Sequence, residues 1–239
     1  MKKLATVASV LLLAACAPSD SETPSPSPLA TPQESISAIP SLAACDSGVV
    51  CDGPLAAGDY VSDTTGAHIE FTLSEHDWSG LADIQDVGFA LFLADVGGGH
   101  GVSVVSYSGE IFTDACSSEV TSTIGATPAD FMTFLAARTG VTATAPVEVE
   151  VGGRPALQVD VTTEIDAACE ATGGGRIWLW ALPIVGDFHF NDAETARVIA
   201  VDGGSATVII VIEAFPDADY DHLLEHATEV IDSMVIEPL

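Results

Sequence analysis

The sequence predicts an α+β fold in which a mainly antiparallel sheet is flanked by helices and preceded by a disordered tether. Three observations favour it. Short segments of alternating apolar and polar residues recur after residue 45, which is typical of half-buried antiparallel strands. One segment, residues 206–214, is apolar on both faces, so we expect it in the middle of the sheet. Two amphipathic segments with the period of an α-helix provide elements that can cover such a sheet.

Residues 1–15 are typical of a bacterial lipoprotein signal peptide. Two lysines precede an apolar run over residues 4–13, which is too short to span a hydrocarbon core of ~30 Å as a helix. The stretch Leu-Ala-Ala-Cys at 13–16 resembles the lipobox, in which Cys16 receives a diacylglycerol and becomes the first residue after cleavage. We therefore expect a lipid anchor in the cell membrane and a protein on its extracytoplasmic side. An ordinary secretory peptide is the alternative.

Residues 16–44 form the expected tether between the lipidated cysteine and the folded part. They are rich in Ser, Pro and Thr and cannot bury enough apolar surface to fold. Residues 45–239 are expected to form a single globular domain, which is long enough to bury a sizeable core.

The expected strands follow from their apolar patterns. Ile69, Phe71 and Leu73 alternate along the first of them. Tight hairpins are expected at residues 152–154 and 202–204, where paired glycines occur. The expected strands are residues 68–73, 87–94, 101–107, 147–151, 156–161, 176–182, 197–201 and 206–214.

Two helices are expected. Thr127 is an N-cap candidate, Pro128 suits the first helical position, and Asp130 adds an early acid to a helix that ends near Arg138. The second helix covers residues 219–233 and has one apolar face, on which leucine, alanine, valine, isoleucine and methionine recur at helical spacing.

The cysteines predict two disulfide bonds. Four cysteines remain when Cys16 is assigned to lipid, and an even number in an exported domain indicates pairing. Four cysteines allow three pairings, of which we favour Cys45–Cys51 and Cys116–Cys169. Neither pair has zinc-ligand spacing, so we expect no metal site among them.

Charge and composition exclude several function classes. After removal of residues 1–15 the chain has no lysine, and its 35 acids and four arginines give a net charge of −31. This field repels nucleic acid, which we do not expect as a partner. Sites that need a catalytic or phosphate-binding lysine cannot form. We expect no cofactor.

Several motifs together resemble a family of exported bacterial lipoproteins of actinobacterial type. They are Phe71-Thr-Leu followed by Trp78, Thr127-Pro128 at a helix start, Val-Glu-Val-Gly-Gly-Arg-Pro-Ala at 149–156, and Ile-Asp-Ser-Met at 231–234. The resemblance covers about residues 55–238. It implies a PsbP-like α/β/α sandwich, a fold that LpqN-type mycobacterial lipoproteins share, and a binding role. It brings no catalytic residues with it.

One candidate ligand site lies around two tryptophans. The spacing of Trp178 and Trp180 predicts that both indoles lie on one strand face, where they could form a platform for sugars or apolar ligands. Arg176 and His189 could add polar contacts. The alternative interpretation places both tryptophans in the core beneath a helix.

Two metal-like strings have simpler explanations. His222-Leu-Leu-Glu-His226 matches the inverted zinc-protease string, but a third ligand is missing and its side chains are expected to face water. The acids at 217, 219 and 221 lack the glycine and glutamate of a calcium loop, so we interpret them as helix-capping residues.

The sequence therefore favours a membrane-anchored binding or interaction module for a protein partner or a small apolar ligand. An envelope hydrolase that uses acidic residues with His100 and His189 is one alternative. A structural lipoprotein without a ligand is the other.

Overall fold

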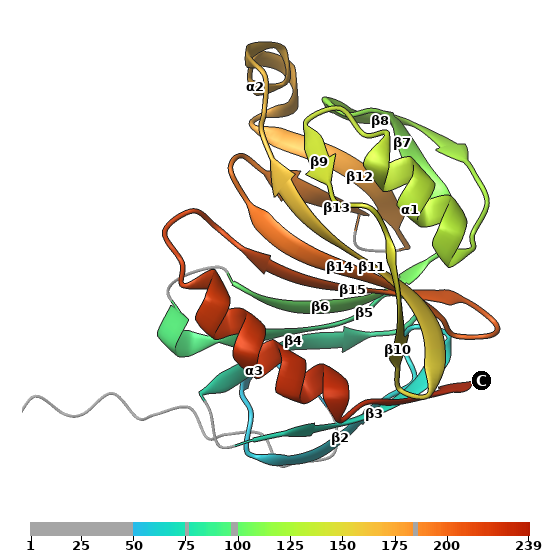
Figure 1. Ribbon diagram of the computed structural model, residues 1–239, viewed down its shortest axis with the longest axis vertical. Helices are drawn as coiled ribbons and strands as arrows, with labels where there is room; N and C mark the ends of the chain where they lie inside the picture. Colours follow the sequence, from blue (N-terminus) through green and yellow to red (C-terminus); the bar gives the residue numbers. More distant parts are fainter. Residues whose placement is uncertain (1–49, 75–76, 97–99, 184–185) are drawn as a thin grey trace, which may run out of the picture. The chain divides into compact units, whose positions relative to one another are not determined.

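The computed structural model describes residues 50–74, 77–96, 100–183 and 186–239 (Figure 1). The expected signal peptide, Cys16, the tether and Cys45 lie outside these residues. Within them the chain forms three antiparallel sheets and three α-helices, which confirms a mainly antiparallel α+β fold. No helix in these ranges is both long enough and apolar enough to cross a membrane.

A nine-stranded sheet is the centre of the fold. Its strand order is β1-β4-β5-β6-β15-β14-β11-β10, and β9 pairs with β11 beside β10. The side chains from Val208 to Ile212 are all buried, as expected for a strand covered on both faces. The strands are β1 (Gly53–Pro54), β4 (Trp78–Ile84), β5 (Gly88–Leu93), β6 (Gly101–Tyr107), β9 (Val141–Ala143), β10 (Val147–Val151), β11 (Arg154–Thr163), β14 (Thr195–Asp202) and β15 (Thr207–Ala214).

The first face of this sheet is covered by α3 and a three-stranded sheet. Helix α3 (Tyr220–Asp232) buries Leu223, Ala227 and Val230 against it, in one cluster with Ile210 and Ile212 of β15. The small sheet has the order β16-β3-β2, and a short 3-10 helix η1 follows β5. Their bounds are β2 (Gly58–Ser62), β3 (Ala67–Leu73), η1 (Ala94–Val96) and β16 (Val235–Pro238).

The second face is covered by α1 and a four-stranded sheet. Helix α1 (Pro128–Ala136) buries Phe131 and Leu135 in a second cluster, which includes Ile209 and Val211 of β15. Figure 1 shows α1 beside the small sheet, whose order is β13-β12-β7-β8. The bounds are β7 (Glu110–Asp114), β8 (Ser117–Thr123), α2 (Ala167–Gly173), β12 (Arg176–Leu182) and β13 (Gly186–Asn191).

The small sheets are the main departure from the sequence prediction, which expected helices alone on each face. Strand β8 was missed because its side chains are almost all exposed, so no apolar alternation marks it. Both predicted helix starts are confirmed. Thr127 and Asp130 form a capping box at α1, and the Asp219 carboxylate accepts from the His222 N–H at α3 (3.1 Å).

Two hairpins occur where paired glycines predicted them. Val151 pairs with Arg154, and the two residues between them have φ values of 60° and 75°, which favour glycine at both positions. At the second hairpin Asp202 pairs with Thr207, so its loop has four residues and is longer than a tight turn.

Two cross-links hold the second cover together. Cys116 and Cys169 form a disulfide across 53 positions of the sequence, as predicted. The buried Arg138, just after α1, donates to the backbone carbonyls of Phe112 (2.8 Å), Asp114 (2.6 Å) and Trp178. Burial lowers the pKa of Arg138 to about 10, so it stays charged at neutral pH. The expected Cys45–Cys51 bond stays a prediction, since Cys45 lies outside the described residues.

Candidate functional site

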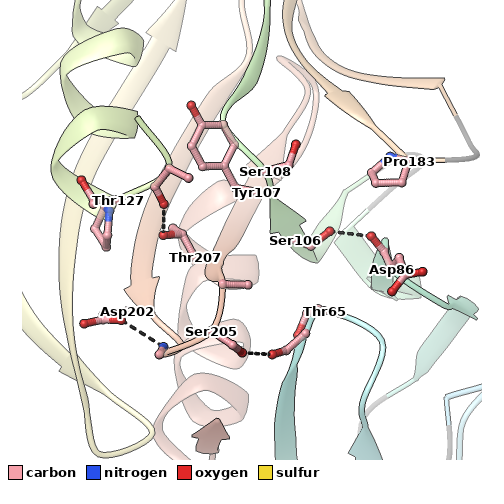
Figure 2. A pocket seen from close by; sticks show the side chains of 15 residues that line it. Thr65, Asp86, Ser106, Tyr107, Ser108, Thr127, Pro183, Asp202, Ser205 and Thr207 are labelled. Atoms are coloured by element: carbon pink, nitrogen blue, oxygen red, sulfur yellow. Dashed lines mark hydrogen bonds between the residues drawn. The ribbon is translucent and has the colours of Figure 1, made fainter. Parts of the chain in front are cut away.

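A pocket of about 540 Å³ lies where loops at the ends of the central strands meet (Figure 2). Thr65 enters from the β2–β3 turn, Asp86 from the β4–β5 turn, and Ser106 from the end of β6. Thr127 comes from the start of α1, and residues 202–207 come from the β14–β15 hairpin. The covers of both sheet faces thus contribute to one pocket.

Hydroxyl groups hold these loops in place. Each hydroxyl that donates its proton to a backbone carbonyl keeps oxygen lone pairs that can accept a hydrogen bond. The Thr65 hydroxyl is fully buried and has no partner among the described residues, which costs free energy unless a ligand or water satisfies it. The donated bonds run from Ser106 to Asp86 (2.6 Å), from Ser205 to Gly66 (2.6 Å) and from Thr207 to Ala126 (2.5 Å).

The pocket is acidic. Asp86 and Asp202 are its charged residues, and none of the described lining residues is Lys, Arg or His. Asp86 has a φ of 66°, an uncommon conformation for a residue other than glycine. Arg154 does not line the pocket but contacts one of its lining residues, since its Nε donates to the Asp202 carbonyl (2.7 Å). Carboxylates, carbonyls and hydroxyl oxygens make this pocket rich in hydrogen-bond acceptors.

Tyr107 connects the pocket with the second apolar cluster. In Figure 2 its ring extends away from the hydroxyl groups of Ser205 and Thr207. The ring packs edge-on against Phe131 and Trp180, with centroid distances of 4.9 and 6.4 Å. Burial raises the pKa of this phenol, so it stays protonated. Tyr107 therefore forms a wall of the pocket.

A second depression of about 640 Å³ adjoins the first. The two share Thr127, Pro128 and Asp202. Ala129 of α1 also lines it, and the remaining residues come from the β10–β11 hairpin with both acidic and apolar side chains: Glu148, Val149, Glu150, Gly153, Pro155, Ala156 and Leu157. The acidic pocket thus continues onto a partly apolar surface.

The tryptophan platform, one of the two interpretations of the sequence, does not form, and the core interpretation holds for Trp180 alone. A β-bulge between Trp178 and Trp180 shifts the pairing with β13, so the two indoles point to opposite sides of the strand. Trp180 is 1% exposed in the second cluster, stacked on Phe188 at 4.3 Å. Trp178 lies outside this cluster, beside the polar residues predicted to accompany it. Its ring centroid is 5.2 Å from that of His189 and 5.6 Å from the Arg176 guanidinium carbon. The bulge brings Arg176, Trp178 and His189 together but excludes Trp180.

His189 has a carboxylate partner. Its Nδ1 lies 3.3 Å from an oxygen of Asp187, and both side chains are about a quarter exposed. Burial and the nearby Arg176 lower the pKa of His189, against the opposing effect of Asp187. Its imidazole is therefore neutral at neutral pH. His100, the other histidine of the hydrolase hypothesis, is buried and accepts from the Phe215 N–H (2.9 Å).

The metal-like strings form ordinary helical contacts. His222 and His226 are neighbours on α3, with ring centroids 4.5 Å apart. The group with ligand-like spacing among the described residues is Cys116, Asp166 and Cys169, in which the two sulfurs are bonded to each other.

The residues of the polar pocket escaped the sequence prediction. They are single Ser, Thr and Asp residues in loops far apart in the chain, so no local spacing connects them. The sequence does contain one signal for another pocket, which is described below. Glu213 is the only charged residue of β15, a strand otherwise made of buried apolar residues and threonine.

Comparisons with known proteins gave structural likenesses alone. No protein-family model matches the chain, and no curated protein sequence matches it. LpqN of Mycobacterium tuberculosis, described as involved in cell envelope biogenesis, is 12% identical over 75% of this chain and 91% of its own, with a TM-score of 0.40. Cyanobacterial PsbP from Synechocystis is 14% identical over 79% of this chain and 98% of its own, also with a TM-score of 0.40. No residue role is carried over from either protein.

Proposed function

We propose that this protein is an extracytoplasmic binding module, anchored through Cys16, whose polar pocket binds a hydroxyl-rich ligand such as an oligosaccharide. The lining of the pocket carries this proposal. An acceptor-rich wall with two carboxylates and no described basic residue suits a ligand that donates hydrogen bonds and has no negative charge. The volume of about 540 Å³ lies in the range of small-molecule sites.

The same lining changes the ligand class that the sequence favoured. A small apolar ligand would remove Asp86 and Asp202 from water, and the contacts of these carboxylates with Gln85, Gly204 and Arg154 would only partly offset that cost. A hydroxyl-rich ligand can donate to both carboxylates and to the hydroxyl oxygens of Ser106 and Ser205. Pro128 and Pro183 supply apolar edges for the faces of sugar rings.

Calorimetric titration of the full chain with neutral oligosaccharides tests this proposal, with glucose 6-phosphate as the anionic comparison. Ser108→Phe places a ring at the rim of the pocket, and Ser118→Phe places the same ring on exposed β8 as the matched control. We expect a neutral sugar to bind to the wild type and to Ser118→Phe but not to Ser108→Phe. Equal binding to both variants, or a preference for the phosphate, would contradict the proposal.

An envelope hydrolase is the second candidate, because the His189–Asp187 pair provides a neutral imidazole that can accept a proton. This candidate requires turnover of chromogenic esters that is lost in His189→Ala and kept in His68→Ala. Absence of turnover in the wild type would end it.

A further inference from the structure

A separate pocket of about 360 Å³ lies on the second face of the central sheet, beside β13. The register of the strands creates the space. Glu213 is paired with Gly101 on β6 and with Ala196 on β14, so only small residues flank it in its row. Glu194 lies one residue before β14 and lines the same pocket as Glu213. Two carboxylates thus line one pocket.

Glu194 is held firmly and keeps one oxygen without a partner. It is 1% exposed, and its backbone N–H donates to the Thr163 hydroxyl (2.9 Å). Its Oε1 accepts from the Asn191 amide (2.6 Å). Its Oε2 is buried and has no hydrogen-bond partner among the described residues. The Oε2 oxygen of an ionised Glu194 therefore needs a donor that the described residues do not supply, and a ligand could supply one.

Aromatic side chains form another part of the wall, and Asp187, His189 and Asn191 of β13 complete it. Phe92, Phe188 and Phe215 line the pocket with the two glutamates. Phe188 is fixed by its parallel stacking on Trp180, at an interplanar angle of 4°. The negative faces of aromatic rings attract organic cations, and carboxylates accept hydrogen bonds from N–H groups.

The geometry points to this pocket as a second binding site, one for an organic cation with N–H donors such as a primary alkylammonium group. The ammonium donates to the Oε2 of Glu194 and to the Glu213 carboxylate, while its carbon chain lies against the phenylalanines. This site is separate from the polar pocket, so it stands or fails independently of the proposed oligosaccharide binding.

Binding of a cation would favour the ionised forms of Glu194 and Glu213, so it would change the protonation of both carboxyl groups. Burial and the charge of Glu194 raise the pKa of Glu213 to about 8, and burial raises the pKa of Glu194. The other titratable groups around them are Asp187 and His189 on β13 and His100 beside Phe215. We therefore expect tighter cation binding at pH 9 than at pH 6, accompanied by proton release.

The test is calorimetric titration of the full chain with n-butylammonium at pH 9, where an alkylammonium is still protonated because its pKa resembles that of lysine, ~10.4. Tetramethylammonium has the same charge without N–H donors, and 1-butanol has a similar chain without charge. We expect saturable binding of n-butylammonium, with at least ~10-fold weaker binding of both comparison compounds.

The variants locate the binding. Glu213→Gln keeps the size of the side chain and removes its charge. Glu225→Gln, at an exposed position of α3, is the matched control. We expect ~10-fold weaker binding in Glu213→Gln and unchanged binding in Glu225→Gln. Circular dichroism and a urea titration confirm that Glu213→Gln is folded. Wild-type affinity in a folded Glu213→Gln, no binding of n-butylammonium, or its displacement by calcium or zinc ions would overturn the inference.

Discussion

The two faces of the central sheet are covered by different means. On the first face, α3 and the small sheet β16-β3-β2 pack through apolar contacts, including a stack of Tyr60, Phe71 and Phe89. On the second face, Arg138 joins the end of the shorter α1 to the four-stranded sheet, and the Cys116–Cys169 disulfide joins α2 to the β7–β8 turn of that sheet.

The two faces also differ in their buried charged residues. The second face contains the buried charged residues Arg138 and Glu194 and the cation pocket that we infer. Buried charges cost free energy, so a face that contains them needs other contacts to hold its cover. The hydrogen bonds of Arg138 and the Cys116–Cys169 disulfide provide such contacts on the second face.

The largest expected effect comes from emptying either cluster. Trp180→Ala should reduce the free energy of unfolding by about 3–5 kcal/mol and Leu223→Ala by about 2–5 kcal/mol, since each side chain is almost fully buried. β15 belongs to both clusters, so urea should unfold each variant in a single transition. In Trp180→Ala, fluorescence of the remaining Trp78 and Trp178 reports on the first cluster and the second cover. Two separate transitions would show that the faces fold independently.

Removal of the disulfide should have the next largest effect. Cys116→Ser together with Cys169→Ser should cost about 2–4 kcal/mol, because the bond closes a loop of 53 positions in the unfolded chain. Urea denaturation measures this loss, and Ser118→Ala, on the exposed strand β8 of the same cover, is the control for a substitution that breaks no disulfide. A loss equal to that of the control would mean that the disulfide does not stabilise the second cover.

Arg138→Lys should cost about 2–3 kcal/mol. A lysine ammonium cannot reproduce the forked donation to three carbonyls, two on β7 and one on β12. Arg197→Lys provides the matched control, because its bond to the exposed Asp160 carboxylate (2.7 Å) is a surface ion pair worth about 0–1 kcal/mol. Thermal unfolding of both variants should show the larger decrease for Arg138→Lys, and the reverse order would refute the cross-link.

The smallest effect is a dependence on pH. The pKa of Glu213 is raised from 4.5 to about 8 in the fold, so between these values the unfolded chain holds fewer protons and stability falls as pH rises. Glu213 is partly exposed, which screens the effect, and we expect a decrease of about 1–2 kcal/mol. Urea midpoints from pH 5 to pH 9 should decrease less steeply in Glu213→Gln. The same slope in both proteins would exclude Glu213 as its source.

The sequence predicted the elements that a short stretch of neighbouring residues is enough to identify. An unbroken apolar run marks β15, a helical stripe marks α3, and a glycine pair marks the β10–β11 hairpin. The cysteine count favoured Cys116–Cys169. The edge strand β8 has no such signal, because water contacts nearly all of its side chains. The bulge in β12 breaks the two-residue period on which the tryptophan platform depended. The PsbP-like sandwich and the lipid anchor on Cys16 stay predictions.

The candidate pockets depend on contacts between distant segments. Thr65 and Ser205 are separated by most of the domain and become neighbours only when β3 and the β14–β15 hairpin are in place. Their residue types are common in any surface loop. Glu213 could have been singled out from sequence, since a charge inside a doubly buried strand requires an explanation.

Mapping of amide chemical shifts during an oligosaccharide titration tests the central claim most directly. The account predicts saturable changes at Thr65, Ser106 and Thr207, with the amides of α3 unaffected and the changes absent in Ser108→Phe. Saturable changes centred on another surface, or no change at these residues with any neutral oligosaccharide of the panel, would contradict it.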